Sequence, residues 1–202
     1  MNRQDFLIER FGVDAATPAP YYVDMTMGRL PQLFADMGLR VGVEVGVERG
    51  VNATLLLNGM PDLTLFGIDC WEPYEGYREG DRYSARRLDG FYALAKERLA
   101  PFAGRVILRK QFSVEASLAF ADESLDFVFI DANHSFQSCT EDLTAWVPKV
   151  KPGGIVSGHD FYDKQLRCEC VEVESAVRAW TTEQGIAVWF VTADPSWMWV
   201  KA

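Results

Sequence analysis

The chain has only two histidines and four cysteines among its 202 residues, and it lacks an excess of basic side chains. Its formal net charge is −9, so nucleic acid or an anionic membrane surface would be repelled at long range. We therefore expect a small-molecule partner, with no nucleic acid and no membrane involved. A homo-oligomer stays open.

Long hydrophobic runs are also absent, since no apolar stretch reaches the roughly 18 residues of a membrane-spanning helix. The opening sequence, MNRQDFLIER, is too polar for a secretory signal. The four cysteines are few and scattered, which fits reduced thiols better than a disulfide framework, and the pair in RCEC lacks the second pair typical of a zinc site. These absences predict a cytoplasmic protein.

Short β-rich runs alternate with helix-compatible segments from about residue 30 onward. Runs such as FVFI are uniformly apolar and bounded by turn residues, which is typical of buried parallel strands. Strands are predicted at 40–46, 64–70, 105–110, 125–131 and 154–159. VWFVT and WMWVK flank the turn ADPS and predict a terminal hairpin. The expected fold is one α/β domain spanning 1–202, a Rossmann-like doubly wound, seven-stranded and mostly parallel sheet with a C-terminal antiparallel hairpin.

Two segments stand outside this alternation. Residues 1–30 are expected to form an N-terminal helical cap or a dimer contact. Residues 71–92, rich in Tyr, Arg, Gly and Glu, follow a strand; a lid or acceptor-side insertion and an ordinary exposed loop leading into FYALAKERL both remain open. Among the helix boundaries, Ser113 is predicted to cap an amino terminus, and the Pro-Gly-Gly at 152–154 to precede a strand. The acids of the pair at 141–142 are expected in a solvated helical turn.

The segment VGVEVGVERGVNATLLL combines a strand, a glycine loop and a helix. Gly46 and Gly50 let backbone amides approach a ligand that a side chain would block. A dinucleotide fingerprint needs Gly-x-Gly-x-x-Gly, whereas this loop has Glu44-x-Gly46-x-x-x-Gly50 and places Glu48 where it would repel a pyrophosphate. Asp69 ends the next strand and can accept hydrogen bonds from both hydroxyls of a ribose. Adenosine without phosphates fits this pattern better than NAD.

The glycine loop, the acid at Asp69 and the terminal hairpin together resemble the class I S-adenosylmethionine-dependent methyltransferases. SLDFVFIDANHSFQSCTEDLTAWVPKVKPGGIVSGHDF is similar to the subfamily of Methyltransf_24 type, in which a strand ends in Asp-x-x-His, a helix carries an Asp-Leu pair, and Pro-Gly-Gly precedes a closing His-Asp. The resemblance implies a methionine side lined by the glycine loop, a ribose held by Asp69, and an adenine beside Ser113. The implied cofactor-binding residues are Glu44, Gly46, Gly50, Asp69, Cys70, Trp71, Ser113 and Asp131.

Both histidines follow predicted strands whose carboxyl ends carry an acid. Ligands of open α/β sheets bind at such ends, so Asp131, His134, His159 and Asp160 are expected to converge on one pocket. Methyl transfer to a hydroxyl needs a base, a metal that stabilises the alkoxide, or both. We expect His134 as the base, with Asp131 and His159 as further catalytic residues.

A divalent metal is the second element of this hypothesis, with Asp131, His159 and Asp160 as candidate ligands. Asp131 and Asp160 resemble the acidic ligands of metal-dependent O-methyltransferases. His159 departs from that pattern, because an imidazole shifts preference from Mg²⁺ toward transition metals such as Mn²⁺. A metal-free site with a histidine base stays open.

The sequence thus predicts an enzyme that transfers a methyl group from S-adenosylmethionine to a small molecule, most readily to a hydroxyl of a sugar, polyketide or other secondary metabolite. Two alternatives remain. An NAD-dependent oxidoreductase shares the sheet and the ribose acid. A non-catalytic module that only binds S-adenosylmethionine would keep the cofactor pocket.

Overall fold

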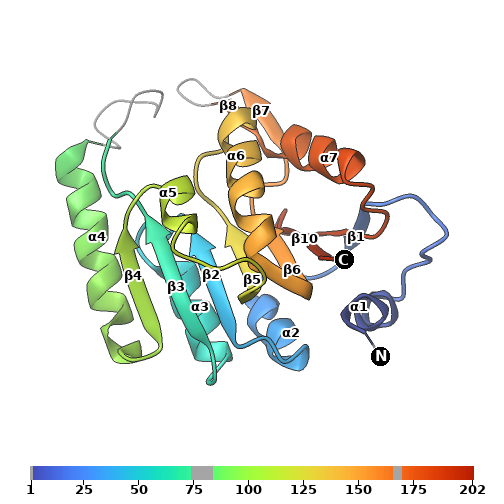
Figure 1. The fold of residues 1–202 in the computed structure, drawn as a ribbon, viewed down its shortest axis with the longest axis horizontal. Helices are drawn as coiled ribbons and strands as arrows, with labels where there is room; N and C mark the ends of the chain where they lie inside the picture. Colours follow the sequence, from blue (N-terminus) through green and yellow to red (C-terminus); the bar gives the residue numbers. More distant parts are fainter. Residues whose placement is uncertain (1, 74–83, 166–169) are drawn as a thin grey trace.

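The computed structural model describes residues 2–73, 84–165 and 170–202, which form a three-layer α/β domain (Figure 1). The strands are β1 Tyr21–Val23, β2 Val41–Val45, β3 Thr64–Asp69, β4 Val106–Lys110, β5 Leu125–Ile130, β6 Val150–Gly158, β7 Asp163–Gln165, β8 Cys170–Glu172, β9 Phe190–Thr192 and β10 Trp197–Val200. The α-helices are α1 Arg3–Phe11, α2 Leu30–Asp36, α3 Val51–Gly59, α4 Ala85–Leu99, α5 Ser113–Ser117, α6 Phe136–Trp146 and α7 Val173–Glu183.

The main sheet has the strand order β1-β9-β10-β6-β5-β2-β3-β4. Strands β6, β5, β2, β3 and β4 are parallel, and β10 pairs antiparallel with both β6 and β9. The predicted doubly wound sheet and its terminal hairpin are therefore confirmed. The order reverses at β2 and β5, and such a switch point opens a crevice at the strands' carboxyl ends.

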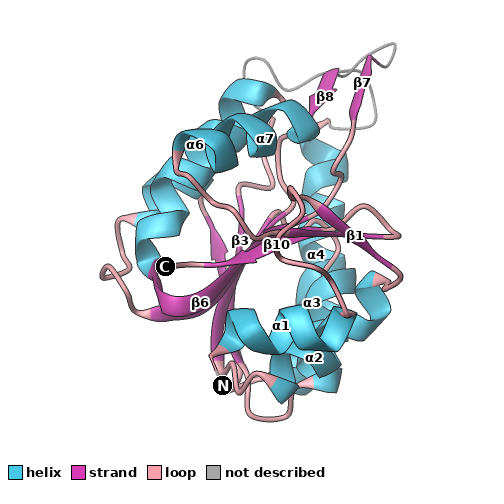
Figure 2. Ribbon diagram, turned by 90° about the vertical axis from the view of Figure 1, so that its right-hand side faces the viewer, coloured by secondary structure: helices cyan, strands magenta, loops and turns pink. Residues whose placement is uncertain are grey.

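Helices cover both faces of this sheet (Figure 2). Helices α1 to α4 lie on one face, where Leu7, Phe34, Leu56 and Leu99 belong to a single buried cluster. Helices α5, α6 and α7 supply a second cluster on the opposite face. Burial on both sides explains why the central strands consist of continuous apolar runs.

The strand count differs from the prediction, because the main sheet has eight strands instead of seven. The additional strand, β1, lies within residues 1–30, where a helical cap or a dimer contact was expected, and it pairs parallel with β9. Tyr21 and Val23 are buried while Tyr22 between them is exposed. Three residues of alternation are too short a signal to distinguish from a loop. The helical expectation is met only by α1 and α2.

Three local predictions also need correction. Phe112, not Ser113, is the N-cap of α5, and Ser113 is its first helical residue. Strand β6 begins at Val150, so the Pro-Gly-Gly lies inside the strand, where Gly153 and Gly154 pair with Lys201. Helix α4 starts at Ala85, before FYALAKERL. Of the candidate lid, residues 74–83 lie outside the described residues. Within the described ranges, no helix has the length and apolar character needed to cross a bilayer.

Candidate active site

A groove of about 1230 Å³ opens at the carboxyl ends of the central strands and continues between α5 and α6. Six of the eight predicted cofactor-binding residues line it: Gly46, Asp69, Cys70, Trp71, Ser113 and Asp131. His134 lines it as well, and Glu44, Gly50, His159 and Asp160 do not. The crevice expected from the strand order is thus present, and most of the predicted residues face it.

Gly46 lies in close contact with the residues that follow β5. Its φ is +92°, and a Cβ atom there would lie 1.8 Å from the carbonyl oxygen of Asp131. Its amide donates to the carbonyl of Ile68 at 2.8 Å, which fixes the loop to β3. Gly50 also has a positive φ, +73°, and begins α3. The sequence requires glycine at position 46 because no other residue fits this backbone.

Asp69 ties the glycine loop to the end of β3. Its Oδ2 accepts from the amide of Glu48 at 2.8 Å, and its Oδ1 accepts from the amide of Trp71 at 2.8 Å. Burial raises the pKa of the Asp69 carboxyl, and these two amides offset part of the increase. Each carboxylate oxygen keeps acceptor capacity for a further donor. Asp69 can therefore bind a ligand hydroxyl while it also holds the loop.

Cys70 and Trp71 continue the groove beyond Asp69. The indole of Trp71 is 1% exposed, donates to the carbonyl of Glu48 at 2.7 Å and packs against Tyr92 at a centroid distance of 4.5 Å. Burial raises the pKa of the Cys70 thiol. Trp71 is therefore held rigidly between the glycine loop and α4, which supports the wall of the groove.

Glu44 lies on β2 and is buried behind the groove. Its Oε1 accepts from Nδ2 of Asn52 at 3.2 Å. Oε2 of Glu44 and Oδ1 of Asn52 are buried acceptors without a hydrogen-bond partner in the described residues. Burial raises the pKa of Glu44 to about 8. Two buried oxygens without partners suit a cationic donor such as an ammonium group, whose charge would favour the ionised form of Glu44. Asn52 was missed in the sequence, because an amide inside a helix carries no distinctive pattern.

The Glu44→Gln substitution is expected to change how stability depends on pH. In the unliganded protein Glu44 retains its proton up to about pH 8, whereas in the unfolded chain it loses the proton near pH 4.5. The contribution of Glu44 to the free energy of unfolding should therefore fall as the pH rises from 4.5 to 8. In this range the carboxyl is still protonated in the folded protein, whereas it has lost its proton in the unfolded chain. Glutamine cannot ionise, and its amide can donate to Asn52. The variant should be more stable above pH 8 by roughly 1–3 kcal/mol and similar to wild type at pH 4.5.

Urea unfolding of both proteins across this pH range measures the effect. Glu97→Gln is the control, because Glu97 is an exposed acid on α4. Parallel pH profiles for wild type and Glu44→Gln would contradict the assignment of this buried acid.

Ser113 takes part in a buried hydrogen-bond chain between α5 and α6. Its hydroxyl donates to Oδ1 of Asp142 and accepts from the indole of Trp146 at 2.8 Å. Asp142 is 4% exposed, and burial raises the pKa of its carboxyl to about 7. The expectation of a solvated turn is correct for Glu141, which is exposed, and wrong for Asp142. Adjacent residues on a helix point in directions about 100° apart, so only one of the two acids faces α5.

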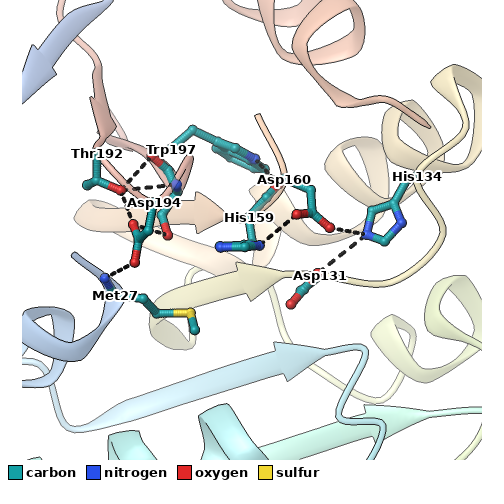
Figure 3. A network of polar contacts seen from close by, with 9 residues as sticks. Met27, Asp131, His134, His159, Asp160, Thr192, Asp194 and Trp197 are labelled. Atoms are coloured by element: carbon teal, nitrogen blue, oxygen red, sulfur yellow. Dashed lines mark hydrogen bonds and ion pairs between the residues drawn. The ribbon is translucent and has the colours of Figure 1, made fainter. Parts of the chain in front are cut away.

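The four predicted polar residues at the ends of β5 and β6 do converge (Figure 3). Nε2 of His134 lies 3.1 Å from Oδ2 of Asp160 and 3.4 Å from Oδ1 of Asp131. Nδ1 of His159 lies 3.0 Å from Oδ1 of Asp160. Asp160 thus stands between the two histidines, and His134 stands between the two acids.

The electrostatics of this cluster follow from its charges. Burial alone would raise the pKa of Asp160, but the hydrogen bond from His159 and the charges of both histidines keep it below its ordinary value. Burial would lower the pKa of His159, but the hydrogen bond to Asp160 and the charges of Asp131 and Asp194 raise it. Paired in this way, the groups stabilise one another's charged forms.

The set with metal-binding geometry differs from the predicted one. One ligand atom from each of Asp131, His134 and Asp160 lies within 4.8 Å of the others. A carboxylate pair with one imidazole is a donor set that fits a divalent cation. His159 instead contacts Asp160 from the side and donates or accepts through Nδ1. Its role as a ligand stays a prediction.

Asp194, in the turn before β10, lies on the side of His159 that is away from His134 (Figure 3). Its Oδ1 accepts from Oγ1 of Thr192 at 2.5 Å, and its Oδ2 accepts from the amide of Met27. The indole of Trp197 donates to the carbonyl of His159 at 3.1 Å. The hairpin therefore braces the end of β6. Sequence reasoning missed this part because it assigned Asp194 only to the turn.

Comparisons with known proteins agree with this architecture. Residues 43–161 match a family model described as a methyltransferase domain, Methyltransf_24. A comparison with curated protein sequences finds no match. Many solved structures share the fold, among them the following three. A protein from Corynebacterium glutamicum has a TM-score of 0.61 and 17% identity, covering 99% of this chain and 88% of its own.

The other two are O-methyltransferases. The enzyme from Bacillus cereus, in complex with SAH, has a TM-score of 0.58 and 16% identity, with 98% of this chain and 90% of that chain covered. TomG from Streptomyces achromogenes, involved in tomaymycin synthesis and in complex with SAM, has a TM-score of 0.58 and 20% identity, with 99% and 88% covered. The family match spans the glycine loop, Asp69 and the histidine cluster. The chain therefore belongs to the Methyltransf_24 family of methyltransferase domains, as its motifs predict.

Proposed function

We propose that this methyltransferase uses S-adenosylmethionine to methylate a hydroxyl group of a small molecule. The observation that carries the proposal is the position of the polar cluster. Asp131 and His134 line the same groove as Gly46 and Asp69, so a proton acceptor and a nucleoside-binding edge share one cavity. The structural relatives in complex with SAH and SAM support the choice of cofactor.

The residues of the groove fit the chemical groups of this cofactor. Asp69 can accept from ribose hydroxyls. Behind the groove and outside its lining, the orphaned oxygens of Glu44 and Asn52 suit the α-ammonium of a methionine moiety. Glu48 disfavours a pyrophosphate in the loop, which counts against NAD. Gly46, Gly50, Cys70, Trp71, Ser113 and Asp131 complete the proposed cofactor site.

The chemistry requires that the acceptor loses a proton as the methyl group arrives. The bound cofactor supplies an electrophilic methyl group on a sulfonium. His134 is the proposed base, because it lines the groove and its Nε2 pairs with the carboxylates of Asp131 and Asp160, which stabilise the imidazolium formed when the other ring nitrogen takes the proton. Asp131 and Asp160 hold the ring in place. His159 orients Asp160 and is a further catalytic candidate.

A divalent metal fits the same cluster through Asp131, His134 and Asp160, whose ligand atoms lie within 4.8 Å of one another. The sequence predicts Asp131, His159 and Asp160 as the ligands instead. A bound metal would lower the pKa of the acceptor hydroxyl. If His134 binds the metal, its imidazole is not available as the base, so the two roles of His134 are alternatives. We propose metal assistance with His159 as the third ligand, which leaves His134 for the proton.

The remaining proposals concern the setting of the reaction. The acidic chain, with a net charge of −9, favours a neutral or cationic small acceptor over nucleic acid. We place the enzyme in the cytoplasm, and a homo-oligomer is compatible with the exposed ring of Tyr22 at the β1 edge.

Calorimetric titration with S-adenosylhomocysteine tests the proposal directly. We expect binding of this thioether in the micromolar range or tighter, and no binding of NAD under the same conditions. Parallel titrations with added Mg²⁺ or Mn²⁺ measure whether the cation binds independently. Binding of NAD without binding of S-adenosylhomocysteine would replace the proposal with an oxidoreductase.

A further inference from the structure

Asp142 is a buried acid that the proposed chemistry does not use, although it lies in the same groove. We infer that Asp142 recognises the 6-amino group of the cofactor's adenine, with Ser113 held beside it. This inference rests on the proposed function, since the adenine belongs to the proposed cofactor. It assigns nucleobase selection to α6, whereas the sequence assigned only the Ser113 region to the adenine.

The geometry leaves one oxygen of Asp142 available. Oδ1 accepts from the hydroxyl of Ser113. In the described part of the chain no hydrogen bond reaches Oδ2. The side chain is 4% exposed and lines the groove. A carboxylate oxygen that faces a largely apolar cavity without a donor can accept a hydrogen bond there, so a ligand N–H group would stabilise it.

The hydroxyl of Ser113 has no proton left to donate to a ligand. A serine hydroxyl has one proton and two acceptor sites. Its proton is directed to Asp142, and one acceptor site takes the indole N–H of Trp146. At pH 8, above the pKa of about 7 of the Asp142 carboxyl, Ser113 and Asp142 therefore present only acceptors toward the groove.

This acceptor surface distinguishes between purine bases. Adenine has a single exocyclic donor, the 6-amino group. Hypoxanthine carries a carbonyl oxygen at the same position, which would lie against a carboxylate oxygen with no proton between them. A site built for an N–H donor rejects such an analogue because its buried acceptor stays unpaired.

The place of Asp142 in the groove suits contact with a nucleobase. Asp69, the proposed ribose ligand, lines the same cavity at the end of β3. Ile68 and Phe112 line it together with Ser113, and they provide apolar surface for a flat ring. Burial raises the pKa of Asp142, and a second hydrogen bond would favour its ionised form.

The experiment compares two probes by calorimetry, S-adenosylhomocysteine and its 6-oxo analogue S-inosylhomocysteine, at pH 8. The wild-type protein should bind the adenine compound about 10- to 100-fold more tightly. In Asp142→Asn, whose amide can donate to a carbonyl, this preference should shrink at least tenfold. Glu97→Gln is the control, because it removes the same charge from an exposed position of α4 that does not line the groove. It should keep the wild-type preference.

Equal affinity of the wild-type protein for the two probes would overturn the inference without any variant, so a misfolded Asp142→Asn protein cannot obscure the result. A preference that persists unchanged in folded Asp142→Asn would overturn it too. Both results leave the proposed function intact, because they require S-adenosylhomocysteine to bind. Failure of S-adenosylhomocysteine to bind at all would instead remove the proposed function.

Discussion

Substitution of His134 by alanine is expected to reduce methyl transfer by about 10²- to 10⁴-fold. The imidazole lies between Asp131 and Asp160, where it can take the acceptor's proton and hold the resulting charge. Alanine keeps neither function. The affinity for S-adenosylhomocysteine should change by no more than a few-fold, since His134 serves the acceptor side.

Turnover is measured with an acceptor found by screening, and cofactor affinity by calorimetry on the same preparations. Gln137→Ala controls for disturbance of α6, because Gln137 is exposed on the first turn and, among the described residues, its side chain bonds only Glu141 along its own helix. It should retain wild-type turnover. If His134→Ala turns over within threefold of wild type, the base is a different residue. If it loses cofactor affinity as well as turnover, His134 belongs to the cofactor site.

Much of the fold was predictable because burial determines which residue types a strand contains. The FVFI run of β5 is apolar throughout since helices cover both faces of the sheet, and the hairpin is marked by its turn residues. The convergence of His134 and Asp160 was also predictable. Parallel strands place their carboxyl ends at one edge, so motifs 26 residues apart in the sequence meet there.

Features that depend on packing between elements have no recognisable local sequence pattern. The strand β1 exists because β9 offers it an edge, and its three residues carry no signal alone. Asp142 and Glu141 are chemically alike and adjacent, and only the placement of α5 decides which is buried. Asn52 and Asp194 find their partners, Glu44 and Met27, across the tertiary structure. Ser113 lines the groove, but its hydroxyl donates to Asp142 and does not cap a helix.

Gly46→Ala is expected to have the largest effect on the cofactor site. The added methyl carbon would lie 1.8 Å from the carbonyl oxygen of Asp131 and 2.8 Å from Cα of Ala132. Both are backbone atoms, so no side-chain rotation can relieve the overlap. The loop or the end of β5 must move, and either movement separates the glycine loop from the residues of the cluster. We expect a loss of stability of roughly 3–5 kcal/mol and no measurable binding of S-adenosylhomocysteine.

Gly104→Ala is the control that distinguishes destabilisation by atomic overlap from destabilisation by backbone strain. Gly104 has nearly the same φ, +91° against +92° for Gly46, but a Cβ atom there meets nothing within 4 Å. The control variant should therefore lose only about 1–2 kcal/mol, the cost of a left-handed conformation for alanine, and should bind the cofactor normally. Thermal unfolding and calorimetry on both variants give the comparison. Similar losses at the two positions would mean that conformational strain alone, not contact with Asp131, accounts for the glycine. A larger loss at Gly46 accompanied by lost binding would establish that the close approach of β2 and β5 builds the cofactor pocket.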